Sequence, residues 1–178
     1  FLDDFGEIDC LINNAAVCYF SDFLDISYEI LERTMAINLY APFLLTQKVG
    51  GLMIEKKIKG SIIFITSISA EYGGSQQAHY CSSKGALELL MKSVAISLGE
   101  FGIRSNSIQP GTIITDINKA QLENNPKLEE YFINRSTLKC LPQPEDIAKV
   151  VLFLASNNSL NISGQSIRVD SGLTCNLQ

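Results

Sequence analysis

Short apolar segments alternate along the chain with longer amphipathic ones. The apolar segments are continuous and short, which is typical of strands that a sheet buries on both faces. They predict strands at 8–12, 61–66, 104–109 and 165–170. The amphipathic segments predict helices at 27–55, 78–101, 117–135 and 144–155. We expect the first helix to break near Asn38 or Pro42, and the third to break near Pro126.

Strands that alternate with helices predict an α/β fold in which parallel strands are joined by right-handed helical crossovers. Open sheets of this kind bind their ligands beyond the carboxyl ends of the strands. The segments that directly follow three of the predicted strands are 13–16, 67–69 and 110–115. We therefore expect the chemistry of the protein to lie in these three segments.

Composition narrows the class of protein. The 178 residues are 46% hydrophobic and 19% charged, which is enough apolar material for the core of one domain. A net charge of −5 argues against nucleic-acid binding, and the longest apolar run, 150–155, is too short to cross a membrane. No Lys or Arg precedes Arg33, so we expect no secretory signal.

The cysteines and the histidine indicate the cellular setting. The five cysteines are an odd number with no CxxC pair, and His79 is the single histidine. Both facts argue against a metal site and against a disulfide framework. We expect a reduced, cytoplasmic protein that holds no metal.

Three side chains could form a proton-transferring group. Tyr80 and Lys84 lie one helical turn apart, and Ser67 follows the end of a predicted strand. A free tyrosine has a pKa of about 10, and a nearby ammonium lowers that pKa by favouring the phenolate. A serine hydroxyl can hold the substrate oxygen while the tyrosine moves its proton.

Each of these features has an ordinary structural explanation on its own. A Tyr-x-x-x-Lys pair is usually a solvated helix face, a serine after a strand is usually a turn residue, and Pro110-Gly111 is usually a strand stop. The order in which they follow successive strands favours the catalytic interpretation.

That joint pattern resembles the short-chain dehydrogenase/reductase family over essentially the whole chain. The segments that carry the resemblance are Ile8 to Ala16, Asn38, Ser67 with Tyr80 to Lys84, Pro110 to Thr115, Pro144 to Ala148 and Gly164 to Asp170. Two positions depart from the family pattern, Ala16 and Ser171, where glycine is usual. The resemblance implies a Rossmann-like, doubly wound parallel sheet and hydride exchange with NAD or NADP.

The resemblance also implies a role for each site residue. Tyr80 is then the general acid/base, Lys84 lowers its pKa and binds the nicotinamide ribose, and Ser67 orients the reacting oxygen. Asn38 holds a water that links Lys84 to solvent. The residues expected to contact the cofactor are Asn13, Ala15, Tyr80, Lys84, Pro110, Gly111, Ile113 and Thr115.

The family's phosphate-binding half is not found in this sequence. No two glycines are separated by one residue, so no G-x-G-x-x-G motif is present. We therefore expect residues 1–178 to be the C-terminal portion of a single NAD(P)-binding Rossmann-fold domain that lacks its first βαβαβ half. The choice between NAD and NADP stays open. The family resemblance implies a tetramer or dimer assembled through the two long helices and the last strand.

The substrate is expected to be a small molecule covered by the polar segment 116–136. Segments 77–80, 110–119 and 176–178 are similar to the L-rhamnose 1-dehydrogenases, which oxidise a sugar at its anomeric carbon to a lactone. Two alternatives remain. One is reduction of a 3-oxoacyl thioester or another carbonyl by the same catalytic group. The other is an inactive fragment that serves only as an oligomerisation or interaction module.

Overall fold

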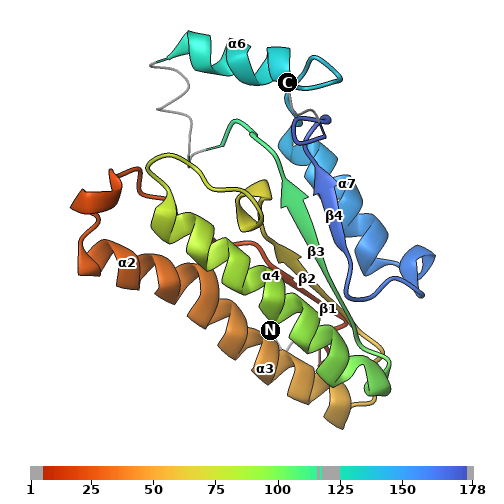
Figure 1. Cartoon of the computed structure of the whole chain (residues 1–178). Helices are drawn as coiled ribbons and strands as arrows, with labels where there is room; N and C mark the ends of the chain where they lie inside the picture. The colour runs from red at the N-terminus through yellow and green to blue at the C-terminus, as the bar shows by residue number, and fades with distance from the viewer. Residues whose placement is uncertain (1–5, 116, 118–124, 176–178) are drawn as a thin grey trace.

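The fold is built on one parallel sheet. The computed structural model describes residues 6–115, 117 and 125–175. Its four strands are β1 (Cys10–Asn13), β2 (Ser61–Ile65), β3 (Arg104–Pro110) and β4 (Ser166–Val169). They lie in the order β1-β2-β3-β4, and every neighbouring pair is parallel (Figure 1). The predicted α/β class and parallel topology are confirmed.

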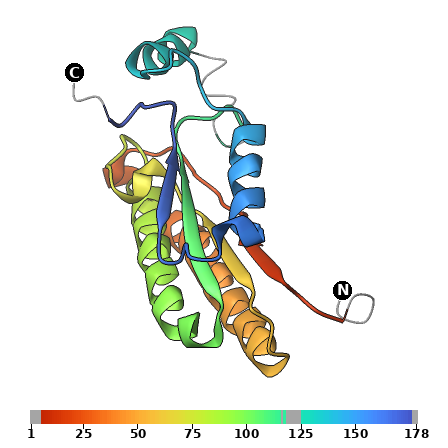
Figure 2. The ribbon, with the colours of Figure 1, turned by 90° about the vertical axis from the view of Figure 1, so that its right-hand side faces the viewer.

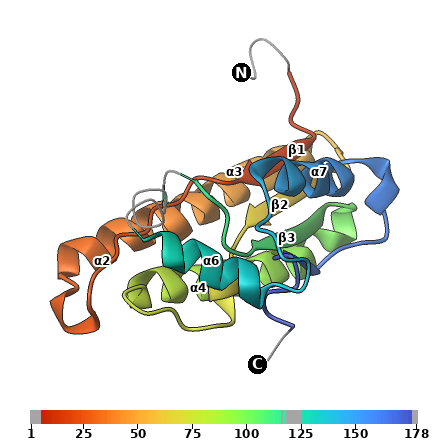
Figure 3. The ribbon, with the colours of Figure 1, turned by 90° about the horizontal axis from the view of Figure 1, so that it is seen from above.

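Helices cover both faces of this sheet. One face carries α3 (Ala41–Glu55) and α4 (Ala78–Leu98), and the other carries α7 (Pro144–Ala155) (Figure 2). The helix α6 (Pro126–Arg135) stands beyond the carboxyl ends of the strands (Figures 1 and 3). The remaining helix, α2 (Tyr28–Met35), precedes α3. Short 3₁₀ turns occur at η1 (Phe23–Asp25), η3 (Ile68–Ala70), η4 (Gly99–Phe101) and η5 (Asn157–Ser159).

The central strand β2 holds the two halves of the core together. Ile62 and Phe64 are fully buried and pack with residues of α3 and α4. Ile63 points to the opposite face, where it packs with Ile147 and Leu154 of α7. Because side chains alternate along a strand, this continuous apolar segment fills both layers at once, as its sequence predicts.

The predicted helix at 27–55 is interrupted around Asn38, where a break was expected, although the chain stays helical there. Ser27 caps its start, since the Ser27 hydroxyl accepts a hydrogen bond from the Ile30 amide at 3.2 Å. A π-helical turn, η2 (Ala36–Tyr40), then connects α2 to α3. The interruption is a π turn, which inserts an extra residue into a helix without ending it, and Pro42 follows this turn as the second residue of α3.

Other predicted boundaries also differ from the structure, most of them by one residue. The first strand begins at Cys10, two residues later than predicted, and the third helix is described only from Pro126 onward. Residues 116 and 118–124 of that predicted segment lie outside the described part. Within the described part, none of the helices combines the length and the apolar content that a membrane crossing requires.

Candidate active site

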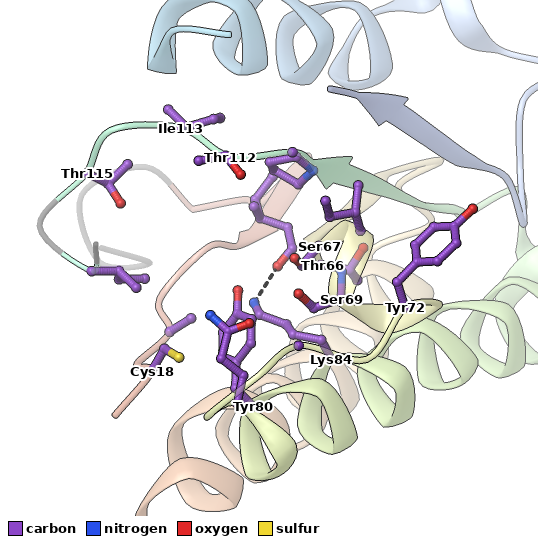
Figure 4. A pocket seen from close by; sticks show the side chains of 18 of the residues that line it. Cys18, Thr66, Ser67, Ser69, Tyr72, Tyr80, Lys84, Thr112, Ile113 and Thr115 are labelled. Carbon is purple, nitrogen blue, oxygen red and sulfur yellow. Dashed lines mark hydrogen bonds between the residues drawn. The ribbon is translucent and has the colours of Figure 1, made fainter. Parts of the chain in front are cut away.

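A cavity of about 750 Å³ opens at the carboxyl ends of β1, β2 and β3 (Figure 4). Its walls come from the segments that follow these three strands, from the start of α4, and from α6, which contributes Leu128 and Phe132. This is the edge at which the sequence predicts the chemistry. The volume lies within the usual range for a small-molecule or cofactor site.

Ser67, Tyr80 and Lys84 come together in the wall of this cavity. Tyr80 and Lys84 lie on the first two turns of α4, and the Lys84 Nζ is 5.6 Å from the centre of the Tyr80 ring. The Ser67 side chain lies close enough to the Tyr80 phenol to lower its pKa. The Ser67 hydroxyl also accepts a hydrogen bond from the Ser69 amide at 3.0 Å, which fixes the turn that follows β2.

Lys84 is an unusually buried cation. Its side chain is 2% exposed, and its Nζ donates a hydrogen bond to the Ile65 carbonyl oxygen at 2.8 Å. Burial lowers the pKa of Lys84 to about 8, because a desolvated ammonium is less stable than a neutral amine; the nearby Cys18 offsets part of this effect. A lysine with this pKa can exchange a proton near neutral pH.

The Tyr80 pKa differs from the expectation. Burial raises the pKa of Tyr80 to about 12, the nearby Ser67 side chain lowers it in part, and Cys18 and Cys81 raise it further. The expectation that Lys84 lowers the Tyr80 pKa is wrong for this structure, because desolvation of the phenolate outweighs every stabilising contact. At neutral pH Tyr80 is therefore a phenol, poised to donate a proton to a carbonyl oxygen.

Asn38 lies behind the cavity wall. It is fully buried within the π turn, and its amide group pairs with both backbone groups of Val17: Nδ2 donates to the carbonyl and Oδ1 accepts from the amide, each at 2.9 Å. Nδ2 also donates to the Ser83 Oγ at 3.0 Å, and that hydroxyl donates to the Tyr80 carbonyl at 2.7 Å. Asn38 thus braces the segment after β1 against the first turn of α4, and π turns are frequent at such functional positions.

Most residues expected to contact a cofactor line the cavity. They are Ala15, Tyr80, Lys84, Pro110, Gly111, Ile113 and Thr115. Asn13 is the exception, since it is absent from the lining, is 6% exposed, and donates from Nδ2 to the Thr46 hydroxyl on α3 at 3.0 Å. Asn13 therefore ties β1 to α3, because residues at alternate strand positions face opposite sides.

The described residues fit the nicotinamide and ribose end of a dinucleotide. Ala15 and Ala16 leave the backbone after β1 accessible to a flat ligand, and Gly111 keeps the backbone after β3 close to β4. A Cβ at Gly111 would lie 2.7 Å from the Cβ of Asp170, so this approach requires glycine. No three metal-ligating side chains gather anywhere in the described ranges.

Several lining residues were not singled out from the sequence. Cys18 and Gln77 stand near Tyr80, and Phe132 enters from α6. Burial raises the pKa of Cys18 to about 11, so its thiol is a neutral part of the wall. The signal that could have found these residues is positional: Cys18 follows the first strand, and Gln77 directly precedes α4.

Known proteins are similar to this chain in sequence and in fold. The family model described as "Enoyl-(Acyl carrier protein) reductase" matches residues 1–174. L-rhamnose 1-dehydrogenase (NADP(+)) of Thermoplasma acidophilum is 41% identical over 177 residues, which cover 99% of this chain and 69% of that protein. L-rhamnose-1-dehydrogenase of Scheffersomyces stipitis is 42% identical over 177 residues, with 99% and 68% covered.

A solved structure agrees with the sequence comparisons. Gluconate 5-dehydrogenase from Burkholderia cenocepacia, in complex with NADP and tartrate, matches with a TM-score of 0.94 and 29% identity, covering 99% of this chain and 69% of that one. The fold, the site and these relatives define an oxidoreductase of the Rossmann class. The chain belongs to the short-chain dehydrogenase/reductase family, as the sequence pattern indicates.

Proposed function

We propose that this chain forms the catalytic part of an NAD(P)-dependent dehydrogenase that oxidises an aldose resembling L-rhamnose at C1 to its lactone. The observation that carries the proposal is the convergence of Ser67, Tyr80 and Lys84 on one cavity at the carboxyl edge of the sheet. The identity of about 41% to L-rhamnose dehydrogenases, over 99% of the chain, supports the choice of substrate.

The chain's own groups account for the proton chemistry. When bound, NAD(P) supplies the hydride acceptor or donor. Tyr80 takes the proton of the anomeric hydroxyl during oxidation and returns it to the carbonyl oxygen during reduction, while the Ser67 hydroxyl holds that oxygen. Lys84 lines the same cavity and would bind a ribose hydroxyl of the cofactor. Because the Tyr80 pKa is about 12 in the free site, oxidation should speed up as pH rises.

The cavity wall suits a deoxy sugar. L-rhamnose carries a methyl group where most hexoses carry a hydroxymethyl group, and Leu128, Phe132 and Ile117 offer an apolar surface on the lid side. An apolar pocket prefers a methyl to a hydroxymethyl group by a modest factor, about 10- to 200-fold. We therefore propose that these three residues contact C6.

One assay tests the proposal. The protein expressed from its complete reading frame is mixed with NAD⁺ or NADP⁺ and with L-rhamnose, L-mannose or D-glucose, and absorbance at about 340 nm is followed, where reduced nicotinamide absorbs. We expect reduction with L-rhamnose and a kcat/KM at least tenfold lower with L-mannose, its 6-hydroxy analogue. Failure of every aldose would refute the sugar proposal.

Reduction of an acyl thioester is a second candidate, favoured by the description of the matching family model. A carrier-protein substrate is acidic and needs a basic surface, whereas this chain has a net charge of −5. Oxidation of NADPH by acetoacetyl thioesters, with no activity on aldoses, would select this candidate instead.

An inactive fragment that serves only as an oligomerisation or interaction module is the third candidate, and titration with NADH tests it. Saturable binding at micromolar NADH would exclude it.

We further propose that residues 1–178 are the C-terminal portion of a single Rossmann domain, because the chain matches about 69% of the first relatives' length. The five free cysteines support a reducing, cytoplasmic setting.

We also propose that the protein forms a homo-oligomer. The outer surfaces of α3 and α4 expose large apolar side chains, among them Leu44, Leu89 and Ile96, at 61%, 65% and 84%. A groove of about 380 Å³ runs between the two helices and is lined by Phe43 and Leu90. Exposed apolar patches on this scale mark protein contacts. Sedimentation velocity should show a dimer or tetramer; a monomer at micromolar concentration would contradict this part.

A further inference from the structure

One face of α4 is attached to the end of β2 at two successive helical turns. The Lys84 Nζ donates a hydrogen bond to the Ile65 carbonyl oxygen at 2.8 Å. The second attachment is made by Glu88, whose Oε2 lies 3.1 Å from the Thr66 hydroxyl; that hydroxyl is equally close to the Ile108 carbonyl oxygen of β3, so the two acceptors share its hydrogen. Residues 80, 84 and 88 share one helix face, and Tyr80 lies beside Ser67 in the cavity wall.

Glu88 binds more of the sheet than Thr66 alone. Its side chain is 5% exposed, and its Oε2 also accepts a hydrogen bond from the Ser107 hydroxyl of β3 at 2.8 Å. Its Oε1 accepts a hydrogen bond from the Ser166 hydroxyl of β4. One carboxyl group therefore joins α4 to the end of β2, to β3 and to β4.

The burial of the Glu88 carboxyl group requires a physical explanation. Burying a carboxyl group costs free energy that only good hydrogen bonds offset, and an aliphatic side chain fills the same space without that cost. Buried polar networks that are fully satisfied specify one arrangement of the elements around them, whereas apolar contacts allow small displacements. A carboxyl group at this position defines where α4 stands relative to the end of β2.

We propose that Glu88 is a positioning residue that, through Thr66, fixes the Ser67 hydroxyl opposite the Tyr80 phenol. Thr66 directly precedes Ser67, so rotation of the chain at Thr66 moves the Ser67 hydroxyl relative to α4. Glu88 does not line the cavity and touches no reacting atom. The effect on catalysis rests on the proposed function, in which Ser67 and Tyr80 share the substrate oxygen.

Four variants separate positioning from stability. Glu88→Leu removes the carboxyl group, and Thr66→Val removes the hydroxyl nearest the site. Glu88→Gln keeps a hydrogen-bonding group, because the serine hydroxyls can turn to accept from its amide. Ser105→Ala is the matched control: Ser105 is fully buried, and its hydroxyl donates to the Met91 carbonyl of α4 at 2.9 Å, one turn farther from the site.

The kinetic expectation is a loss of kcat without a matching change in cofactor KM. A displacement of about 1 Å at a reacting group can cost on the order of 100-fold in rate, so we expect kcat to fall about 10- to 100-fold in Glu88→Leu and in Thr66→Val. Glu88→Gln should stay within about threefold of the wild type, and Ser105→Ala should lose stability while keeping its kcat. Equal kcat values in Glu88→Leu, Thr66→Val and the wild type would overturn the proposal.

Amide hydrogen exchange tests the same point without a substrate. The Ser69 amide is held by the Ser67 hydroxyl, so its exchange reports whether this turn is ordered. We expect exchange of residues 66–70 to rise at least tenfold in Glu88→Leu and to stay unchanged in Ser105→Ala. Unchanged exchange in Glu88→Leu would overturn the proposal even if kcat falls. A wild type inactive on every substrate would refute the proposed function, while the exchange result would still decide the role of Glu88.

Discussion

Replacing the buried Lys84 with methionine should change how the stability of the protein depends on pH. Lys84 has a pKa of about 8 in the folded chain, against 10.5 for an exposed lysine. Between these two values the unfolded chain binds a proton at Lys84 that the folded chain does not. The free energy of unfolding of the wild type therefore rises with pH through this window, and below pH 8 the full cost of burying the ammonium is present.

The size of the effect follows from the two pKa values. Each pKa unit corresponds to about 1.4 kcal/mol, so the contribution of Lys84 becomes more favourable by about 2 to 3 kcal/mol between pH 7 and pH 10. Lys84→Met cannot make this contribution, because its side chain does not titrate. The stability of the variant relative to the wild type should therefore be highest at pH 7 and fall by about 2 to 3 kcal/mol by pH 10.

Urea denaturation of both proteins at pH 7, 8, 9 and 10 measures this difference. Every other titrating group is common to the two proteins, and the lost hydrogen bond to the Ile65 carbonyl shifts the curve by a nearly constant amount. Lys149→Met is the matched control, since it removes an exposed lysine and should keep the pH dependence of the wild type. A constant difference between Lys84→Met and the wild type would refute the claim that Lys84 is a buried cation.

Three further predictions address the packing around the site. Gly111→Ala places a Cβ 2.7 Å from the Cβ of Asp170, so it should lower the free energy of unfolding in urea by about 2 kcal/mol or more. The control is Gly51→Ala in α3, whose added Cβ meets nothing within 4 Å and which should stabilise the protein by about 1 kcal/mol. Equal effects of the two substitutions would contradict the close approach at Gly111. Asn38→Ala should lower the free energy of unfolding by about 3 kcal/mol, since it leaves the backbone groups of Val17 without their partner. A thermal midpoint within about 2 °C of the wild-type value would contradict this. Phe132→Ala should raise the sugar KM about tenfold in steady-state kinetics and leave kcat nearly unchanged; a fall in kcat alone would argue that the lid acts on chemistry and not on binding.

The sequence predicted the parts of the fold that depend on local pattern. The apolar segment at 61–66 became the doubly buried β2, and the spacing of Tyr80 and Lys84 placed both on one face of α4. The parallel pairing of the strands followed from the alternation of strands and helices. These features succeed because each is set by residues that are close in the sequence.

The parts that failed depend on contacts between distant residues. A break near Asn38 was predicted, but the hydrogen bonds from its side chain to the backbone of Val17 were not, because no local pattern reports that contact. In the sequence, Glu88 looks like a solvated helix residue; the structure places around it the hydroxyls of Thr66, which follows β2, of Ser107 on β3 and of Ser166 on β4. The direction of the Tyr80 pKa shift could not be predicted from the sequence, because it depends on how completely the phenol is desolvated in the folded protein.

The central claim is that Tyr80 exchanges the proton that accompanies hydride transfer, and Tyr80→Phe tests it most directly. In the protein expressed from its complete reading frame, the variant should lose at least about 100-fold in kcat for oxidation of L-rhamnose, because a general acid/base contributes about 10²- to 10⁴-fold. Its dissociation constant for NADPH should stay within about threefold of the wild type, since the phenol oxygen is one contact among many. A variant that keeps the wild-type kcat would contradict the account.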